Sequence, residues 1–352
     1  MRLCLSALTA AIVAGGCSSA PDESKIGKLE FYAWFEWHRE KYAAALDKGP
    51  DGATERANLE QMLKFQIDRR FDSIVDRAAN ETDAAKRELA VSALGFSQRP
   101  DAVVHIQSHL ADPLPTIRGT AAASIGILNP PNPPMDKIEP LLSEPDKYVR
   151  QAALFAFKLL CSPDRKPSEG AMRRIEKLAV EDAGFPVRNE AVLALGRIKD
   201  EKSVDVLRKC LTDESVFVRG NAAQVLAGFD PKAARNAVPA LIERLRDGET
   251  GVVERAHYAL KTITGVDMDP QYASWVDWLK EISKVLRFVC EKDNITSEVP
   301  GPCPKCGRQM EAQAIPEAEF ACPDHPKVVS RKPGKCHLCD KELLPQKKDD
   351  QK

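Results

Sequence analysis

Small and apolar residues return with a period of thirty-odd residues through the middle of the chain, from Glu81 to Val266. In each copy an Arg is followed three residues later by Ala, and six or seven residues later by further small or apolar residues. This spacing places them on one helix face. The Arg position falls at Arg87, Arg118, Arg150, Arg188 and Arg219, with Val253 in the last copy. The intervals are 31, 32, 38, 31 and 34 residues, which predicts an array of helix pairs.

Each repeat unit contains a second apolar helix and an acidic residue. Val204, Leu207 and Leu211 are typical of the second helix. The acid stands six residues before the Arg position, at Glu81, Asp112, Glu144, Asp182, Asp213 and Asp247. It lies in the turn before a helix, where negative charge suits the helix dipole, and it can also meet an Arg of its own or an adjacent repeat. We therefore expect a ladder of partly exposed ion pairs, each worth about 0.3–1 kcal/mol, and not an anion-binding row.

These positions resemble the HEAT-repeat family from Glu81 to Val266. The resemblance implies an all-α fold, a HEAT-type α-solenoid over 81–286, in which stacked helix pairs bury faces that one pair cannot bury alone. The family mostly supplies binding scaffolds, so the resemblance implies a protein partner along the curved face. Val253 departs from the Arg pattern, as the terminal repeats of such arrays often do because they cap the stack.

Residues 28–80 predict helices that cap the array at its N-terminal end. The first helix, Lys28 to Leu46, is dense in aromatic side chains: Phe31, Tyr32, Trp34, Phe35 and Trp37. These side chains could dock on a partner or on lipid, but packing on the array is the favoured interpretation. A second helix is predicted over Asn58 to Ala78, with apolar residues at i+4 steps: Leu59, Leu63, Ile67 and Phe71.

The array is predicted to close with a helix that follows Asp269 and Pro270 and carries Trp275 and Trp278. This segment resembles the end of many bacterial HEAT arrays. We expect its two indoles to cover the last apolar face of the stack.

Composition narrows the function classes. With 352 residues about two domains are expected, and a net charge of −1 provides no global field to attract nucleic acid. The sequence shows no nucleophile–base pair, phosphate loop or carboxylate dyad. We therefore expect a protein that is not an enzyme and has neither a nucleic-acid partner nor a small-molecule substrate.

The N-terminus predicts export. Arg2 is followed by an apolar run, Leu3 to Val13, which is too short to span a bilayer. The run ends at Gly16-Cys17-Ser18, which resembles the bacterial lipoprotein signal, although Ala14 stands where that family prefers Leu. The resemblance implies removal of residues 1–16, lipidation of Cys17, a polar tether over 17–27 and a place in the cell envelope, with Ser18 favouring the outer membrane. The alternative is ordinary cleavage that leaves Cys17 free.

Six of the ten cysteines lie in residues 287–346, in two similar halves. The first half contains Cys290, Cys303 and Cys306, and the second contains Cys322, His325, Cys336 and Cys339. Each half has one Cys followed by Pro-Gly-x-Cys-x-x-Cys, and a Cys-x-x-Cys turn directs two thiolates toward one tetrahedral ion. Two alternatives stay open. The two Cys-x-x-Cys turns could share a single Cys4 site, or each could be a disulfide, since the chain is predicted to be exported.

The second half resembles the heavy-metal-binding domain of copper and heavy-metal efflux proteins, through Cys322-Pro323-Asp324-His325-Pro326 and Pro333-Gly334-Lys335-Cys336-His337-Leu338-Cys339. The resemblance implies metal binding. Asp324 and Asp340-Lys341 replace the family's Met and Gly-Met. These replacements remove the soft thioethers that would favour Cu(I). We therefore predict a Cys3His zinc site from Cys322, His325, Cys336 and Cys339, although another soft heavy metal stays possible.

The first half has Asp293 where the second half has His325, so its fourth ligand is open between Asp293, Met310 and water. A module with so little core needs a metal to fold, which favours structural zinc over metal transport. Metal handling in an efflux system is the alternative function. The charged end, 347–352, is predicted to be disordered.

Overall fold

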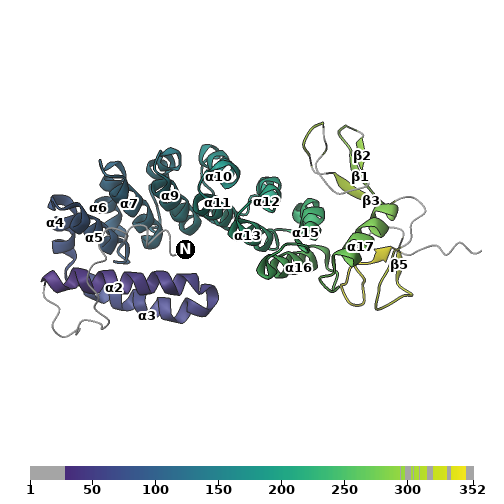
Figure 1. Ribbon diagram of the computed structural model, residues 1–352, viewed down its shortest axis with the longest axis horizontal. Helices are drawn as coiled ribbons and strands as arrows, with labels where there is room; N and C mark the ends of the chain where they lie inside the picture. The colour runs from purple at the N-terminus through teal and green to yellow at the C-terminus, as the bar shows by residue number, and fades with distance from the viewer. Residues whose placement is uncertain are drawn as a thin grey trace, which may run out of the picture. The chain divides into compact units, whose positions relative to one another are not determined.

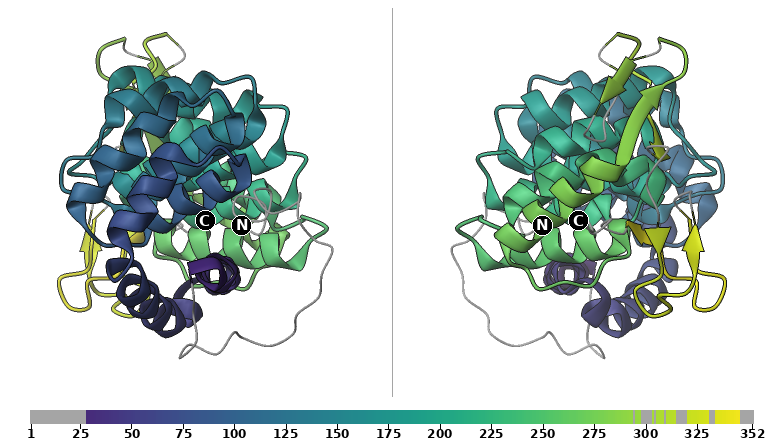
Figure 2. Two further views of the ribbon diagram at one scale, coloured as in Figure 1. Left: turned by 90° about the vertical axis from the view of Figure 1, so that its left-hand side faces the viewer. Right: turned by 90° about the vertical axis from the view of Figure 1, so that its right-hand side faces the viewer.

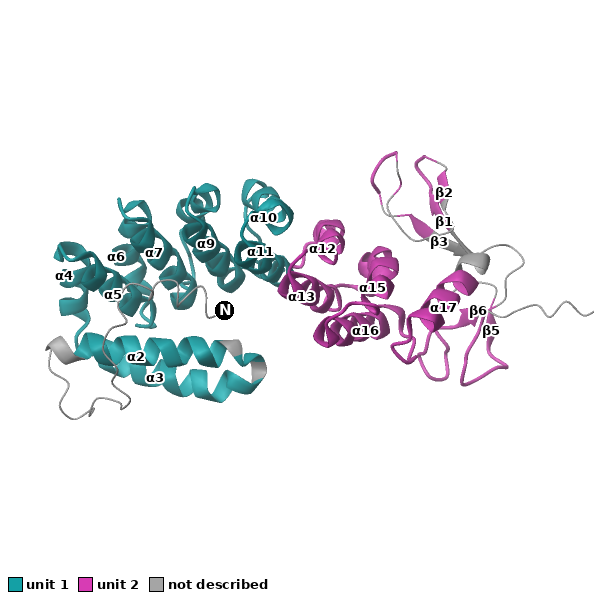
Figure 3. Ribbon diagram, viewed as in Figure 1, with its two compact units in different colours: residues 1–198 teal, residues 199–352 magenta. Residues whose placement is uncertain are grey.

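The computed structural model describes residues 28–293, 295–297, 303, 305–308, 310–314, 320–330 and 334–345. The chain forms two compact units, 1–198 and 199–352 (Figure 3). Helices account for most of residues 28–285, and short strands follow, so the predicted helical array with a small Cys-rich end is confirmed. The predicted signal sequence, the tether with Cys17 and the end at 347–352 lie outside the described residues. Among those described, no helix is long and apolar enough to cross a membrane.

Unit 1 begins with two helices that pack as a hairpin, α2 (Lys28–Asp47) and α3 (Ala53–Asp68), joined by η2 (Gly49–Gly52) (Figure 1). The single helix predicted over 58–78 is wrong, because α3 ends before Arg70 and α4 (Phe71–Asn80) begins after it. The apolar residues at i+4 steps continue across the break, but those before it and those after it belong to helices that pack on different neighbours. Leu63 and Ile67 belong to α3, which packs on α2, whereas Phe71 belongs to α4, which packs on α5 (Ala84–Gly95).

The repeats are helix pairs in which the first helix is often short or partly 3-10. Unit 1 continues with η3 (Pro100–Ala102), α6 (Val103–Ile106), η4 (Gln107–Ala111), α7 (Pro115–Leu128), α8 (Met135–Ile138), η5 (Glu139–Ser143), α9 (Lys147–Leu160), α10 (Glu169–Glu181) and α11 (Phe185–Ile198). Unit 2 contains η6 (Glu201–Ser203), α12 (Val204–Cys210), α13 (Val216–Leu226), α14 (Pro231–Ala234), η7 (Arg235–Ala237), α15 (Val238–Arg244), α16 (Thr250–Thr264) and α17 (Tyr272–Val285). Within unit 1, α5 packs on α7, α7 on α9 and α9 on α11, while α13 packs on α16 in unit 2.

The Arg positions link successive repeats. Arg150 donates from Nη1 to the main-chain oxygen of Glu144, at 2.8 Å, and from Nε to the carboxylate of Asp182 in the next repeat, at 2.7 Å. The same pairing joins Arg87 to Asp112, Arg118 to Glu144 and Arg219 to Asp247. The ladder is less exposed than expected, because the side chain of Asp182 is only 3% exposed and that of Arg150 only 16%. Each link therefore supports the stack more than an ordinary surface ion pair would.

The N-terminal helices are fixed to the array by aromatic packing and by the buried pair of Arg39 with Glu88. Phe31, Trp34 and Phe35 are buried, and the Phe35 ring meets Phe96 at 5.8 Å, which confirms the predicted packing of this helix on the array. His38 is also buried, and its Nδ1 lies 2.8 Å from the main-chain oxygen of Trp34.

At the other end, α17 packs on α15 and buries Trp275 completely. Trp275 Nε1 donates to the main-chain oxygen of Asp269 at 3.0 Å, and the centroids of the Trp275 and Trp278 rings are 5.4 Å apart. This is the predicted aromatic cap.

Two small antiparallel sheets follow α17. The first has the order β2-β1-β3, from β1 (Leu286–Cys290), β2 (Ile295–Ser297) and β3 (Glu311–Ala314). The second has the order β5-β4-β6, from β4 (Phe320–Ala321), β5 (Val329–Ser330) and β6 (Leu344–Pro345). Figures 1 and 2 show that the two sheets lie apart from each other in unit 2.

Candidate metal centre

Two loops of the second sheet bring four metal-ligand side chains together. Cys322 and His325 lie in the turn after β4, which is closed by bonds from Cys322 N to Val328 O and from Val328 N to His325 O, at 3.1 and 2.8 Å. Cys336 and Cys339 lie in a tight turn before β6. Its closing bonds run from Cys336 N to Lys341 O and from Asp340 N to Cys336 O, at 2.7 and 2.8 Å. The backbone of Asp340 is left-handed, with φ at 59°, as so tight a turn requires.

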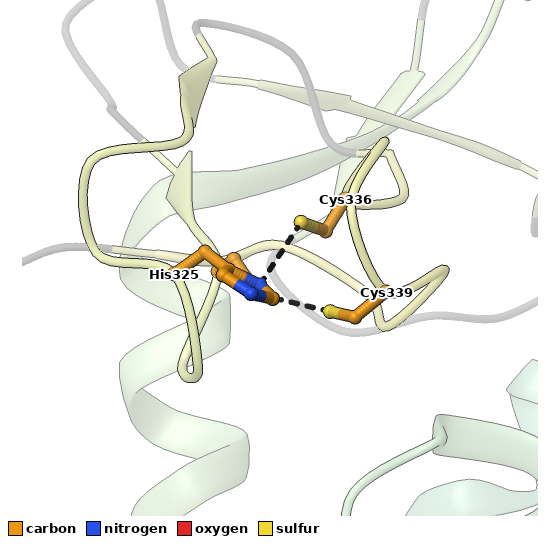
Figure 4. A group of neighbouring side chains, drawn as sticks. His325, Cys336 and Cys339 are labelled. Atoms are coloured by element: carbon orange, nitrogen blue, oxygen red, sulfur yellow. Dashed lines mark hydrogen bonds between the residues drawn. The ribbon is translucent and has the colours of Figure 1, made fainter.

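The four side chains form what we name the second cluster, Cys322, His325, Cys336 and Cys339. Figure 4 shows His325 directed toward Cys336 and Cys339. His325 Nδ1 lies 3.6 Å from the sulfur atoms of both Cys322 and Cys336, and the sulfur atoms of Cys322 and Cys339 are 3.5 Å apart. A tetrahedral zinc ion, bonded at about 2.3 Å to sulfur and about 2.0 Å to nitrogen, separates its ligand atoms by about 3.5 to 3.8 Å. The cluster therefore fits one tetrahedral ion.

The thiols of the second cluster differ in their ease of ionisation. Burial disfavours the Cys336 thiolate, but main-chain N–H groups of Leu338 and Cys339, together with the neighbouring thiols, outweigh it and lower the pKa of Cys336 to about 6. At Cys339 the N–H of Lys341 favours the thiolate. Burial and the thiols of Cys322 and Cys336 disfavour the Cys339 thiolate more strongly, so the pKa of Cys339 rises to about 11. Cys336 thus ionises more readily than Cys339, and a bound cation would displace the remaining thiol protons.

The first cluster consists of Cys290, Asp293, Cys303 and Cys306. The sulfur atoms of Cys290 and Cys306 are 3.5 Å apart, and Asp293 Oδ2 lies 3.6 Å from the Cys290 sulfur and 3.4 Å from the Cys303 sulfur. In each cluster the four possible ligand atoms lie within 4.8 Å of one another.

This arrangement bears on the alternatives that the sequence leaves open. Each Cys-x-x-Cys turn faces its own lone cysteine, so the predicted possibility of one shared Cys4 site is wrong. Of the candidates for the fourth position in the first half, Asp293 joins the thiols, whereas Met310 packs with Phe288 in the apolar core beneath them. All six cysteines of the two clusters are free thiols in this structure, so the disulfide alternative is not observed.

The second sheet and its Cys-rich turns, which we name the second module, are also held against helices of unit 2. We likewise name the first sheet with its cluster the first module. The sequence does not signal this attachment of the second module. Ile282 of α17 packs against the apolar core formed by Phe320, Cys322, Cys336 and Leu343. Glu342 pairs with Arg235 at 3.4 Å. No local sequence motif predicts either contact, because the two sides of each contact are far apart in the sequence.

Comparison with known families agrees with both parts of the molecule. A HEAT-repeat family model matches residues 71–158, 135–227 and 172–261, which together cover more than half of the chain. The chain belongs to the HEAT-repeat family. A heavy metal binding domain model matches residues 320–346, a range that contains the second cluster and excludes the first. HEAT repeats indicate a protein-interaction scaffold, and the Cys clusters indicate metal binding.

Several solved structures have a similar chain course and low sequence identity to this chain. A designed armadillo repeat protein is 19% identical, with a TM-score of 0.42 over 54% of this chain and 98% of that chain. The complex of CpcE and CpcF of phycocyanin lyase from Nostoc sp. PCC7120 is 18% identical, with a TM-score of 0.40 over 58% of this chain and 92% of that chain. The family assignment of this HEAT-repeat protein does not depend on them. No curated protein matches its sequence.

Proposed function

We propose that this HEAT-repeat protein is a non-enzymatic scaffold that holds a protein partner along its second helices. The supporting observation is a row of exposed apolar side chains at the starts of α7, α9 and α11. Leu114, Tyr148 and Phe185 are 39%, 47% and 37% exposed, and they stand four, two and three residues before the Arg position of their repeats. Because the three helices pack one on the next, their N-terminal ends fall along one edge of unit 1, and the three side chains lie on that edge at different offsets from the Arg position.

Such a row suits a protein partner better than a small ligand. Large, stiff aromatic side chains contribute much of the binding energy at protein interfaces, and exposed large apolar side chains along one edge of a domain suit such an interface. No catalytic step and no small-molecule substrate are part of the proposal.

The scaffold proposal can be tested by placing a photo-crosslinking amino acid at Tyr148 in the full chain, in cells that produce it. The matched control position is Arg173 on α10, whose side chain is 72% exposed. We expect a discrete crosslinked protein from position 148 and none from position 173, with loss of the adduct when Leu114 and Phe185 are both changed to Ser. The same pattern of adducts from both positions would contradict a specific docking side.

We further propose that the second cluster holds a structural zinc ion. The Cys3His donor set and its spacing support this, as does the replacement of the family's methionines by Asp324 and Asp340-Lys341. Elemental analysis should find zinc that exchanges only when the module unfolds. The heavy metal binding domain match favours an alternative, metal handling in an efflux system, and that role instead requires rapid exchange of zinc or copper in the folded chain.

For location we propose a lipid-anchored protein of the bacterial cell envelope, on the outer membrane. The support is the Gly16-Cys17-Ser18 pattern after a short apolar run. Cells fed a labelled fatty acid should incorporate it into the wild-type chain and not into Cys17→Ser, and the variant should leave the membrane fraction. Equal membrane recovery of both chains would refute lipid anchoring through Cys17.

A further inference from the structure

The first module repeats the architecture of the second, although the family match begins only at residue 320. In both modules a central strand pairs antiparallel with two neighbours, in the orders β2-β1-β3 and β5-β4-β6. The lone cysteine is the last residue of the central strand in the first module, Cys290, and directly follows the central strand in the second, Cys322. The sulfur of the lone cysteine lies 3.5 Å from that of the last cysteine in each, Cys290 with Cys306 and Cys322 with Cys339. The likeness is therefore one of topology and of ligand placement.

The turns that carry the paired cysteines also correspond bond for bond. Cys303 N donates to Arg308 O at 2.7 Å, as Cys336 N does to Lys341 O, and Gly307 N donates to Cys303 O at 2.8 Å, as Asp340 N does to Cys336 O. The fifth residue of the bonded turn is left-handed in both, with φ at 69° for Gly307 and 59° for Asp340. The same pair of hydrogen bonds and the same left-handed residue mean that both turns present their thiols alike.

The apolar support beneath the thiols is shared as well. Phe288 and Met310 are 3% and 6% exposed under the first cluster. Phe320 and Leu343, which occupy the equivalent places, are 1% and 8% exposed under the second. The one change in the ligand set is at the fourth position, where Asp293 stands in place of His325. Its side chain is 9% exposed and directed at the thiols.

We propose that Cys290, Asp293, Cys303 and Cys306 form a second metal site, which takes a divalent ion of the zinc class through three thiolates and one carboxylate. Tetrahedral zinc accepts sulfur and carboxylate oxygen together, whereas a hard carboxylate suits a soft monovalent ion poorly. The thiol protons leave to solvent when the ion binds. Lys305 Nζ, 3.9 Å from Asp293 Oδ1, partly offsets the negative charge of this ligand set. The site is independent of the scaffold role and of the second cluster.

The first test uses the full chain, reduced and freed of metal, with Co2+ as the probe. We expect two ions per chain, with the absorption of tetrahedral thiolate-bound Co2+. Cys303→Ser and Cys336→Ser should each bind one ion, and the double variant should bind none. Asp293→Ala should weaken the first site at least tenfold and shift its visible bands, and Asp293→His should restore binding. One ion per wild-type chain, with Cys336→Ser binding none, would overturn this proposal and leave the second site intact.

The second test needs no variant, so a failure to fold cannot obscure it. Wild-type chain is treated with an alkylating reagent with and without Zn2+, and modification is read peptide by peptide. Zn2+ should protect Cys290, Cys303 and Cys306 as well as the cysteines of the second cluster. Protection confined to Cys322, Cys336 and Cys339 would contradict a first site, as would a Cys303–Cys306 disulfide in the protein isolated from cells.

Discussion

At the residue scale, a buried carboxylate joins the N-terminal helices to the repeats. Glu88 on α5 accepts a bond from Arg39 Nη1 on α2 and another from Thr120 Oγ1 on α7, both at 3.1 Å. Arg39 also donates to Ser92 at 3.2 Å, and all four residues are buried. The Glu88 side chain thus connects three helices, so its removal should weaken the packing of all three.

We expect Glu88→Ala to lower the free energy of unfolding by about 3–5 kcal/mol, because it leaves the buried guanidinium of Arg39 without its charge partner. Urea denaturation measures this. Asp68→Ala is the control, since it breaks an exposed i,i+4 pair with Lys64 and should change stability by less than about 0.5 kcal/mol. Equal effects from the two variants would show that burial of the Arg39–Glu88 pair does not matter.

The inter-repeat ladder predicts a pH effect at Asp247. The bond from Arg219, more than any other cause, holds the pKa of Asp247 below its ordinary value, and the side chain is 2% exposed. A carboxyl whose pKa is lower in the folded state contributes stability above its unfolded pKa, and this is lost as pH falls through the folded pKa. Asp247→Asn should therefore cost about 1.5–3 kcal/mol at pH 7 and progressively less below about pH 4, as urea denaturation at each pH can show. A constant difference between wild type and variant from pH 7 to pH 3 would rule out this contribution.

At the element scale, the small residues of the repeat pattern decide how closely neighbouring helices approach. A Cβ placed on Gly126 of α7 would lie 2.8 Å from Ala156 Cα of α9, closer than packed atoms tolerate. A Cβ on Gly119 of the same helix would meet the Ala152 side chain at an ordinary 3.5 Å. The two glycines therefore form a matched pair, one in a tight contact and one beside room for a methyl group.

Gly126→Ala should destabilise the fold by about 1–3 kcal/mol, because α7 and α9 must move apart. Gly119→Ala should be neutral or stabilise it by up to about 1 kcal/mol, since Ala favours the helix. Thermal unfolding followed by circular dichroism compares the two variants. If both raised the melting temperature, the close contact of α7 with α9 would not limit the packing.

At the scale of the whole molecule, the two kinds of architecture should respond differently to loss of metal. The helices of each unit bury many apolar side chains, whereas each Cys-rich module has only a few buried side chains around its thiols. Contacts such as Ile282 with the second module's core join that module to the end of the helical array in unit 2.

If the clusters hold zinc, a chelator with a reducing agent should leave the helical circular dichroism signal almost unchanged. Hydrogen exchange should rise throughout residues 320–345 and at the end of α17, and not in α13, because the core over Ile282 loses its order. Loss of helical signal in parallel with metal release would show that the array itself depends on the modules.

The sequence by itself determined the features that depend on residues close together in the chain. The Arg position lies in the first turns of a helix, and the acid six residues before it lies in the preceding loop. The places of Arg150 and Glu144 could therefore be predicted from their spacing alone. The same holds for the paired thiols of Cys336 and Cys339. Local spacing translates directly into local geometry, which is why the repeat array and the two Cys motifs could be predicted.

Only the tertiary structure decided what meets across distance. It showed Arg150 paired with Asp182 of the next repeat, the break between α3 and α4, and two separate Cys clusters in place of one. It also selected Asp293 over Met310, because the carboxylate lies among the thiols while the thioether lies in the core. These outcomes depend on distances between segments that folding brings together, and no local pattern of residues encodes such distances.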